Sequence, residues 1–325
     1  MARVAVDALG GDRAPEEVVA GALAAAAGGI DVVLHGPEGL DTGGLELVVA
    51  PTVIGMAEKP AEAVRAKPDS TLVSAVRAVA DGKADAVVSA GNTGAMLAAG
   101  LLEIRRLPDV HRPAIAVPLP SIGGTSVLID AGANADARPE HLVQFGHMGS
   151  VFAEEILAIP KPTVALLSIG EEPEKGNRLV RETHPLLETS RLDFVGNVES
   201  RELLAHAADV VVCDGFTGNM ALKLMEGTIK TLLDEFRKEI EESARGKLGG
   251  LLIRPAARGL RRRLDPDTYG GAYLLGLRGL VVIAHGSSSR TAIANAITLG
   301  AQGAAGKGVE RVAARLEEEV AAAPG

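Results

Sequence analysis

The sequence contains no tryptophan, and its phenylalanines and tyrosines total seven in 325 residues. Platforms on which nucleic-acid bases stack are built from aromatic side chains, so the composition argues against nucleic acid as a partner. A hydrophobic fraction of 47% is still enough for a sizeable core, as one large α/β domain or two smaller ones. Valine, leucine, isoleucine and alanine must supply most of that core.

Cysteine and long apolar runs are also scarce. The single cysteine, Cys213, excludes an intramolecular disulfide and any zinc site that uses several cysteines. No apolar run reaches the ~18 residues that a membrane span needs, and the first residues lack the pattern of a signal peptide. We therefore expect a cytoplasmic protein that does not cross a membrane.

Positive charge is in deficit, with 33 Lys and Arg against 42 Asp and Glu, a net charge of −9. An acidic surface repels polyanions, so any anion site must be local. Residues 243–263 hold seven basic residues and no acidic one, which leaves −16 on the rest of the chain. Leucines interleave with these cations, a pattern that suits an anionic bilayer, an acidic protein partner or a second subunit. The candidate patch comprises Arg245, Lys247, Leu251, Leu252, Arg254, Arg258, Arg261, Arg262 and Arg263.

Short runs rich in valine and isoleucine alternate with longer helical patterns. The predicted strands are 3–7, 32–34, 45–50, 86–89, 115–119, 127–130, 164–169, 194–196, 210–213 and 280–284, and predicted helices include 15–27, 71–81, 139–156, 177–190 and 289–303. Most strand runs are continuously apolar, which is typical of strands covered on both faces. This alternation predicts a largely parallel sheet between helices. We expect one domain over residues 1–325, with residues 223–264 as a helical hairpin projecting from it, a tight turn at Gly123-Gly124 and a glycine-rich turn at Gly270-Gly271.

Polar, glycine-rich turns follow six of the predicted strands. Parallel sheets place ligands beyond the carboxyl ends of their strands, and glycines let backbone amides converge on an anion. Each turn taken alone is most often only a turn, but together they suit a phosphate pocket. The candidate ligands of phosphate or an acyl thioester are Asp7, Gly10, Gly11, Gly91, Asn92, Thr93, Gly94, Asn134, Gly176, Asn177, Asp214, Gly218 and Ser287.

Several reactive side chains have both a structural and a functional interpretation. Cys213 ends a predicted buried strand, where a free cysteine usually packs, and the sequence assigns it no partner base. His285 lies at a predicted strand end, where it either transfers a proton, binds an anion or simply shapes the turn. Lys175, among glutamates, either pairs with them or reaches an anion. His141 and His184 lie inside predicted helices, which favours capping or packing.

The common nucleotide and hydrolase motifs are missing. No G-x-G-x-x-G follows the first strand, no P-loop is present, and neither H-E-x-x-H nor G-x-S-x-G occurs. These absences argue against a dinucleotide-binding domain, a P-loop enzyme, a zinc hydrolase and a serine esterase.

A series of motifs in a specific order and spacing runs nearly from end to end of the chain. They are DALGGD (7–12), MAEKPAEAVRAKPDS (56–70), SAGNTGA (89–95), RPAIA (112–116), DAGANAD (130–136), RPEHLVQFG (138–146), IGEEPEKGN (169–177), GNVESR (196–201), DGFTGNMALK (214–223), YGGAYLLGL (269–277) and HGSS (285–288). In these motifs the chain resembles the phosphate acyltransferases of bacterial phospholipid synthesis. It departs from them in having Leu9 where Met is frequent and Ser289 where Asp is frequent.

The resemblance implies a three-layer α/β/α fold, similar to isocitrate and isopropylmalate dehydrogenases and to phosphotransacetylases. It implies a homodimer that needs no metal or organic cofactor and moves a fatty acyl group from acyl carrier protein to inorganic phosphate. The acyl phosphate would pass to a membrane-bound glycerol-3-phosphate acyltransferase. The hairpin would attach the protein peripherally to the inner face of the cell membrane.

The family motifs favour Lys175 and Asn219 as catalytic residues that hold phosphate or the oxyanion, with His285 as a second candidate that takes the phosphate proton. Direct attack by phosphate is preferred over an acyl-enzyme, because no pair of nucleophile and base is visible. Three other functions stay open. They are a short-chain phosphotransacetylase acting on acetyl-CoA, a decarboxylating dehydrogenase using NAD and metal-binding aspartates, and a scaffold that recruits acyl carrier protein without catalysis.

Overall fold

The computed structural model describes residues 1–264 and 270–321, and within these ranges eleven strands form one sheet. The strands are β1 (Arg3–Asp7), β2 (Asp31–Gly36), β3 (Glu46–Val49), β4 (Ala86–Ser89), β5 (Ala114–Ser121), β6 (Gly124–Ile129), β7 (Thr163–Ser168), β8 (Asp193–Glu199), β9 (Val210–Val212), β10 (Ala272–Leu275) and β11 (Leu280–Ile283). Their order is β3-β2-β1-β4-β11-β10-β5-β6-β9-β7-β8. Both outer parts pair in parallel, while β11–β10, β10–β5 and β5–β6 pair antiparallel in the middle.

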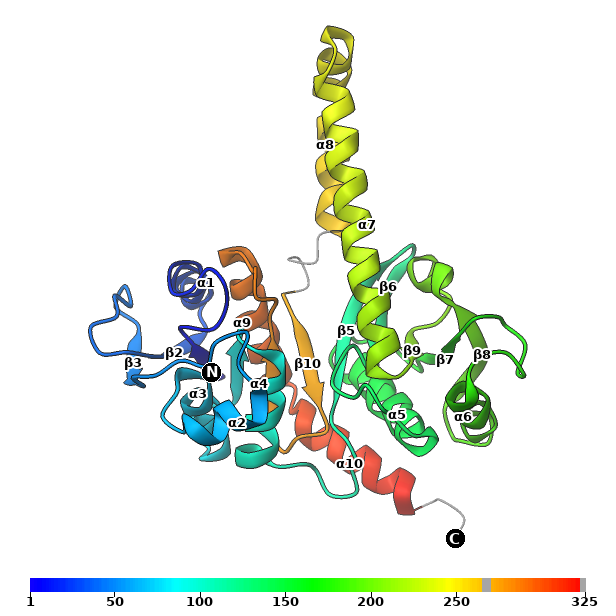
Figure 1. Cartoon of the computed structure of the whole chain (residues 1–325), viewed down its shortest axis with the longest axis horizontal. Coiled ribbons are helices and arrows are strands. Elements are labelled where there is room, and N and C mark those ends of the chain that lie inside the picture. The colour runs from blue at the N-terminus through cyan, green and yellow to red at the C-terminus, as the bar shows by residue number, and fades with distance from the viewer. Residues whose placement is uncertain (265–269, 322–325) are drawn as a thin grey trace.

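Helices cover both faces of the sheet (Figure 1). One face packs against α1 (Glu16–Ala27), α5 (Pro139–Glu155), α6 (Arg178–Glu188), α9 (Arg290–Ala305) and α10 (Gly308–Ala321). The other packs against α2 (Pro60–Ala66), α3 (Thr71–Ala80), α4 (Thr93–Ala99) and α7 (Gly215–Glu241). Successive strand residues serve opposite layers: Val4 and Val6 join the first cluster and Ala5 the second. The three-layer α/β/α fold with a largely parallel sheet is confirmed.

Burial along the strands explains why the apolar runs were continuous. All residues of β4 and β11, which lie in the middle of the sheet, are buried, whereas the edge strand β3 is largely exposed. Central strands between two helical layers need apolar side chains on both faces, and an edge strand does not. The hairpin turn predicted at Gly123-Gly124 joins β5 to β6, with Gly123 at φ +101°.

Strand β10 is the strand that the sequence did not reveal. Its four residues, Ala272–Leu275, lie between Gly270-Gly271 and Gly276. We expected only a glycine-rich turn there, because so short an apolar run between glycines carries little periodicity. Its antiparallel pairing to both β5 and β11 joins the two halves of the sheet.

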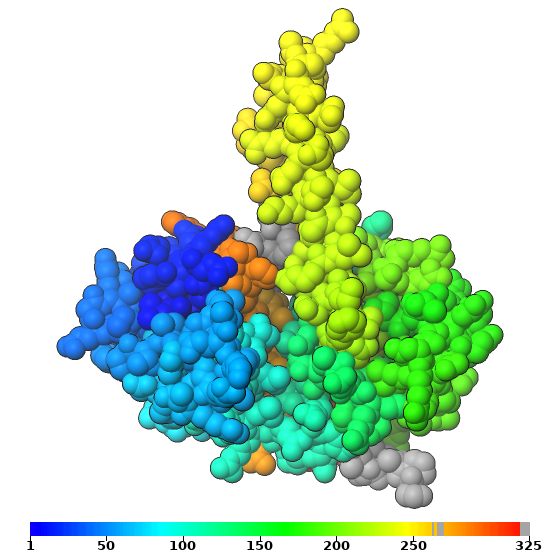
Figure 2. All heavy atoms as spheres, viewed as in Figure 1, coloured from blue at the N-terminus to red at the C-terminus, as the bar shows by residue number. Residues whose placement is uncertain are grey.

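A helical hairpin of α7 and α8 (Ala244–Leu264) projects from the body of the molecule, as predicted (Figures 1 and 2). Its first helix starts at Gly215, within the body, and continues without a break into the projecting part. Glycines allow the two helices to approach closely: a Cβ on Gly250 would lie 2.5 Å from Cγ2 of Ile240. None of the described helices is both long and apolar enough to span a bilayer.

The buried histidines serve structural purposes. Nδ1 of His141 accepts the backbone N–H of Arg138 at the start of α5, and Nδ1 of His184 is 2.9 Å from Oδ1 of Asn197. His35 on β2 is 2% exposed, its Nδ1 lies 2.8 Å from Oγ of Ser74 on α3, and its Nε2 has no hydrogen-bond partner.

Burial lowers the pKa of His35 to about 4, so the neutral form is required in the folded protein. The unfolded chain binds a proton near pH 6.5, so the stability contributed by neutral His35 is full above pH 6.5 and is lost as pH falls towards 4. Because of His35, the free energy of unfolding should fall by about 2 kcal/mol as the pH is lowered from 7 to 5. Urea unfolding of wild type, His35→Gln and the exposed-site control His111→Gln at both pH values would measure it. The His35→Gln variant should lose about that much pH dependence, and an unchanged dependence would contradict the assignment.

Candidate functional site

A cavity of about 420 Å³ lies where the two halves of the sheet part, beneath α7. Strand β10 pairs with β5 through Ala114–Ala116, but β5 continues to Ser121 with β6 as its partner. The gap left beyond Ala116 becomes the cavity, whose size is within the range of small-molecule sites. It lies at a change of strand direction, where open α/β sheets commonly bind ligands.

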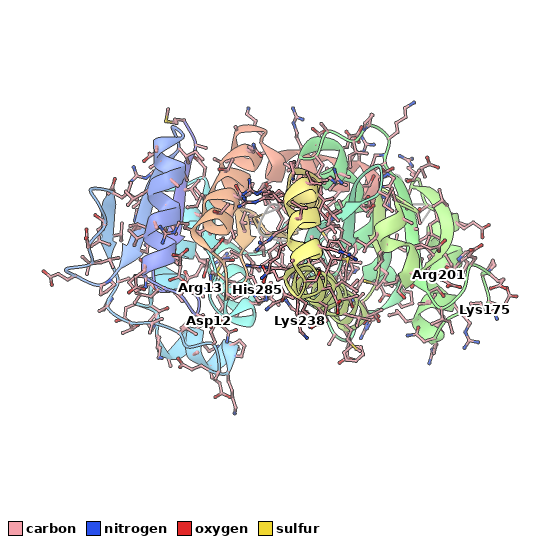
Figure 3. All side chains as sticks on the ribbon, turned by 90° about the horizontal axis from the view of Figure 1, so that it is seen from above. Asp12, Arg13, Lys175, Arg201, Lys238 and His285 are labelled. Atoms are coloured by element: carbon pink, nitrogen blue, oxygen red, sulfur yellow. The ribbon has the colours of Figure 1, made fainter. Side chains whose placement is uncertain are left out.

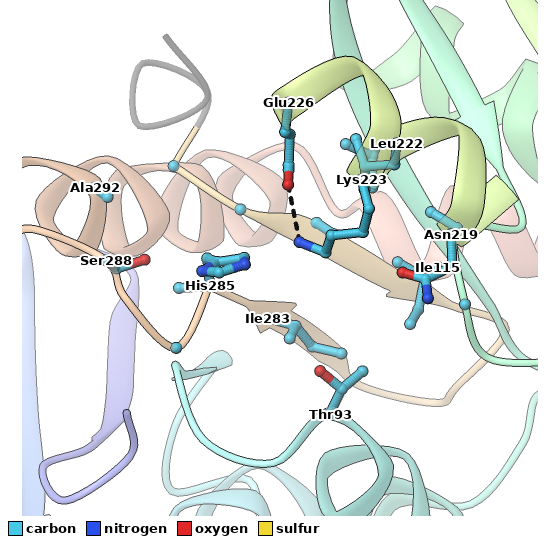
Figure 4. Close-up of a pocket in the computed structure, with 18 of the residues that line it drawn as sticks. Thr93, Ile115, Asn219, Leu222, Lys223, Glu226, Ile283, His285, Ser288 and Ala292 are labelled. Carbon is cyan, nitrogen blue, oxygen red and sulfur yellow. Dashed lines mark hydrogen bonds and ion pairs between the residues drawn. The ribbon is translucent and has the colours of Figure 1, made fainter. Parts of the chain in front are cut away.

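The cavity has a polar end formed by turns and by α7. The turns after β1, β4 and β11 supply Asp12, Gly91, His285, Gly286 and Ser288, the start of α4 supplies Thr93, and α7 supplies Asn219, Lys223 and Glu226. Figure 4 shows Asn219 and Lys223 reaching down from α7 towards Thr93 at the start of α4 and towards His285. Of the predicted site residues, the structure thus brings together Gly91, Thr93, Asn219 and His285.

The other wall of the cavity is apolar. It is formed by Ile115, Val117 and Leu119 on one face of β5 and by Leu222, Met225 and Ile229 on α7. Pro118 and Pro120 also line it, on the part of β5 that β10 leaves unpaired. Proline has no N–H, so an unpaired strand edge is where a sheet tolerates it. This edge therefore exposes apolar rings to the cavity instead of free amide donors.

Asp7 holds the turn that follows β4 in place through hydrogen bonds made by Ser89. It is 2% exposed, and the hydroxyl of Ser89 donates to its Oδ2 at 2.6 Å, while the backbone N–H of Gly91 donates to that same hydroxyl at 3.0 Å. Burial raises the pKa of Asp7. A Cβ on Gly10 would lie 2.5 Å from Oδ2 of Asp7. The geometry gives Asp7 and Gly10 a part in positioning Gly91, and neither lines the cavity.

Asn92 joins the start of α4 to the loop that carries Met56 and Glu58. Its Oδ1 accepts the N–H of Ala95 and caps α4, while its Nδ2 donates to the carbonyls of Met56 and Glu58 at 3.0 and 3.2 Å. Glu58 in turn accepts from Lys67 at 2.7 Å, and this hydrogen bond lowers the pKa of Glu58. Met56 lines the cavity. The side chain of Asn92, a predicted ligand, is thus fully engaged in the fold.

The loop after β6 folds around one carboxylate. Asp130 is fully buried and accepts the backbone N–H groups of Ile115, Gly132, Ala133 and Asn134 at 2.7–3.1 Å. The carboxamide of Asn134 also donates to Asp130 at 2.9 Å. Asn134, another predicted ligand, therefore closes this loop, whose Gly132 lines the cavity.

The start of α7 is fixed against the same loop. Asp214 caps the helix by accepting the N–H and the hydroxyl of Thr217 at 2.9 and 2.7 Å. A Cβ on Gly218 would lie 2.0 Å from the carbonyl oxygen of Asp130, so α7 approaches that loop as only glycine allows. This contact sets the position of the next residue, Asn219, whose Cβ lies 3.6 Å from the Cβ position of Gly132.

His285 is held by its own turn. The backbone N–H of Ser287 donates to Nδ1 of His285 at 3.2 Å, and the Ser287 hydroxyl lies 2.8 Å from that nitrogen. A neutral imidazole that accepts at Nδ1 carries its proton on Nε2. The adjacent carbonyl of Gly286 accepts the N–H of Asp12 at 2.7 Å, and Gly11 has φ +110°. The turns after β1 and β11 thus hold each other at the polar end.

Lys175, Gly176 and Asn177 do not line the cavity. Lys175 is exposed on the loop after β7, and Figure 3 shows it beside Arg201, on the other side of the hairpin from His285. Asn177 caps α6 by accepting the N–H of Val180 at 3.0 Å, and Gly176 has φ +102°. In the sheet order, β10, β5, β6 and β9 separate β7 from β11. A catalytic role for Lys175 therefore stays a prediction from the motifs.

Two further predicted residues have clear surroundings. Gly94 lies on α4, where a Cβ would lie 2.5 Å from Cγ of Pro60 on α2. Cys213 is 3% exposed, its Sγ lies 3.5 Å from the carbonyl oxygen of Asp130, and burial raises the pKa of its thiol well above the ordinary value. A protonated thiol away from the cavity is a poor nucleophile.

We expect Cys213→Ser to keep turnover within about threefold of wild type, because the hydroxyl can donate to the same carbonyl and no step uses the thiolate. Steady-state rates together with near-ultraviolet circular dichroism would check this. A correctly folded Cys213→Ser protein without turnover would show that the thiol takes part.

A basic groove of about 1160 Å³ runs from the cavity along the hairpin. Lys223, Glu226, Ile229, Leu264 and His285 line both spaces. Of the predicted patch, Lys247, Leu251, Arg254, Arg258 and Arg261 line the groove, together with Ser287 and with Arg13 from the body. Arg245 and Leu252 are exposed on α8 outside it, Arg263 is exposed too, and the side chain of Arg262 lies outside the described residues.

Comparison with known proteins decides the family. A profile described as "Fatty acid synthesis protein" matches residues 2–311. The phosphate acyltransferase of Heliobacterium modesticaldum is 46% identical over 313 residues, 93% of each chain, and that of Desulfitobacterium hafniense Y51 is 47% identical over 308 residues, 91% of this chain and 92% of the relative. The chain belongs to the phosphate acyltransferase family. The resemblance seen in the motifs is confirmed.

Solved structures of lower identity share the fold of this family member. A phosphotransacetylase from Streptococcus pyogenes superposes with a TM-score of 0.61 at 18% identity, over 93% of each chain. The EutD phosphotransacetylase of Staphylococcus aureus gives 0.60 at 17% identity, over 93% of this chain and 94% of the other. These likenesses show the α/β/α architecture that the family resemblance had implied.

Proposed function

We propose that this acyltransferase moves a fatty acyl group from acyl carrier protein to inorganic phosphate and releases acyl phosphate for phospholipid synthesis. The observation that carries the proposal is one cavity with two unlike ends. The wall between β5 and α7 is apolar and suits an alkyl chain, while the turns after β1, β4 and β11 offer hydroxyl, amide and imidazole groups that suit phosphate. The relatives' names, phosphate acyltransferase, support transfer of an acyl group to phosphate.

The reaction needs positioning more than proton transfer. A phosphate oxygen attacks the thioester carbonyl, the bond between carbonyl carbon and sulfur breaks, and the thiol leaves with the proton that phosphate gives up. Holding phosphate beside the carbonyl makes the step effectively unimolecular, and each well-placed donor to the oxyanion is worth about 3–4 kcal/mol. We assign that donor role to the Asn219 carboxamide. His285 accepts from Ser287 at Nδ1 and carries its proton on Nε2, so we assign it a hydrogen bond to phosphate in place of the predicted role as proton acceptor, and the phosphate proton passes to the leaving thiolate. Lys175 does not line the cavity of this chain. Its catalytic role is therefore predicted from the motifs and has no support from its position.

The proposal also names the acyl donor and a contact with the membrane. The basic groove leads directly into the cavity and is lined by Arg254, Arg258 and Arg261, so an acidic carrier protein that docks there could deliver its thioester. Leu251, Leu252 and Phe236 are 62%, 76% and 54% exposed on the hairpin, which favours peripheral contact with an anionic bilayer. The product would then reach a membrane-bound glycerol-3-phosphate acyltransferase without leaving the surface.

A homodimer is also part of the proposal. Phe216, Met220 and Leu224 recur at every fourth residue of α7 and are 62%, 58% and 73% exposed. Side chains at this spacing form one stripe on a helix. An exposed apolar stripe of this kind marks an interaction site, and a second copy of the chain is the partner that we propose for it.

The test is an incubation of purified protein with palmitoyl-acyl carrier protein, with and without phosphate, that follows the free carrier thiol and traps acyl phosphate as the hydroxamate. We expect both products only when phosphate is present. Acetyl-CoA is the second donor, because the fold neighbours include phosphotransacetylases, and preference for it would favour the short-chain function. No release from either donor, by protein that binds the carrier, would leave the scaffold function.

A further inference from the structure

One cation lies inside the cavity, and the sequence alone did not single it out. Lys223 follows Asn219 by four residues on α7, so both side chains lie on the same face of the helix. Figure 4 shows the Lys223 side chain over the cavity, between His285 and Asn219. Among the described residues that line the cavity, Lys223 is the only lysine or arginine.

In the structure, this cation forms an ion pair with Glu226. The ammonium Nζ of Lys223 lies 2.9 Å from Oε2 of Glu226, one helical turn further along α7. The two side chains are 47% and 24% exposed, and ion pairs in such surroundings contribute little to stability. An arriving dianion can therefore replace the carboxylate as the partner of Nζ at low cost. The pair keeps the ammonium over the cavity until that happens.

The rest of the polar end lacks positive charge. Thr93, Asn219 and Ser288 contribute neutral groups, and Asp12 is acidic. Phosphate near neutral pH carries one to two negative charges, and the tetrahedral oxyanion adds negative charge as it forms. Charge-assisted hydrogen bonds are about twice as strong as neutral ones, and lysine is a common ligand of phosphate.

We propose that Lys223 is a catalytic residue: its ammonium leaves Glu226, binds the inorganic phosphate at the polar end of the cavity and stays in contact with it during attack on the thioester. Lys223 remains protonated throughout, so the phosphate proton still leaves by the route described above. The inference rests on the proposed function for its chemistry, while its binding step can be measured without any acyl donor.

The experiment measures binding of inorganic phosphate by isothermal titration calorimetry to wild type, Lys223→Met and Lys230→Met. Lys230 is exposed on the same helix and lines the groove but not the cavity, so its removal controls for a general loss of positive charge. We expect Lys223→Met to weaken phosphate binding about 10- to 100-fold, Lys223→Arg to restore part of it, and Lys230→Met to leave it unchanged. Circular dichroism checks that the variants fold. We expect no loss of structure, because the Lys223 side chain is half exposed.

Kinetics provide a second measurement that a merely structural role would not change. In Lys223→Met the KM for phosphate should rise while the KM for acyl carrier thioester stays near the wild-type value. Wild-type phosphate affinity in Lys223→Met, or no phosphate binding by wild type, overturns the assignment of Lys223. Binding that depends on Lys223 in a protein without transferase activity supports the site and contradicts the proposed function alone.

Discussion

Replacing Gly218 by alanine should cost at least 100-fold in kcat/KM and about 2 kcal/mol or more of stability. The added Cβ would lie 2.0 Å from the carbonyl oxygen of Asp130 and 2.8 Å from Sγ of Cys213. The carbonyl oxygen of Asp130 is a backbone atom, which cannot turn aside as a side chain can, so α7 itself must move. That movement displaces Asn219 and Lys223 together from the polar end, and a 1 Å misplacement of reacting groups costs about 100-fold.

The control for this change is on the same helix. A Cβ on Gly227 meets no atom within 4 Å, so Gly227→Ala should gain up to about 1 kcal/mol from helix propensity and leave turnover near wild type. Thermal unfolding and steady-state kinetics of both variants would separate the effects. Full activity in Gly218→Ala would show that the close approach of α7 to the Asp130 loop does not set the site.

The second large effect is expected for Asp130→Ala, which should lower the free energy of unfolding by about 3–5 kcal/mol. Four backbone N–H groups and the Asn134 carboxamide lose their buried acceptor, and each unsatisfied buried donor costs about 1–3 kcal/mol. Relaxation of the loop and entry of water reduce the sum.

If the alanine variant does not fold, Asp130→Asn still allows the contribution of the carboxylate to stability to be measured. The carbonyl oxygen of the asparagine can take the place of Oδ1, which accepts from Ile115, Gly132 and Ala133. Its NH₂ group then takes the place of Oδ2 and faces the two N–H donors of Asn134. Urea unfolding should place it between wild type and Asp130→Ala. Asp136, which lies outside this network in the same turn region, provides the control as Asp136→Asn. Equal stability of wild type and Asp130→Asn would contradict the role given to the carboxylate.

The fold was largely predictable because central strands of a layered α/β protein need apolar residues on both faces. Val87 and Val281 belong to continuous apolar runs for that reason. The strand order was not predictable, since nothing local states that β10 pairs with both β5 and β11. That order separates Lys175 from His285, which the sequence had grouped only by their positions after strands.

The site was predictable at the level of turns and less so at the level of side chains. Asn92, Asn134, Asn177 and Asp214 stood out because short polar residues follow strands, and each proves to cap a helix or close a loop. The same chemistry that would bind a ligand satisfies backbone donors, so the residue type cannot distinguish the two. Lys223 was missed because a lysine in a long helix normally faces solvent. Its spacing of four residues from Asn219 was the available signal.

The most direct test of the account is the chain-length preference of Met225→Trp. Met225 lines the apolar wall opposite β5, so an indole there should shorten the space for the alkyl chain. We predict that kcat/KM falls at least 10-fold for palmitoyl-acyl carrier protein relative to an octanoyl donor, since lost alkyl burial costs about 0.8 kcal/mol per CH₂. Leu232→Trp, at a 65% exposed position on α7, should leave this ratio unchanged. An unchanged ratio in Met225→Trp would contradict the claim that the cavity between β5 and α7 holds the acyl chain.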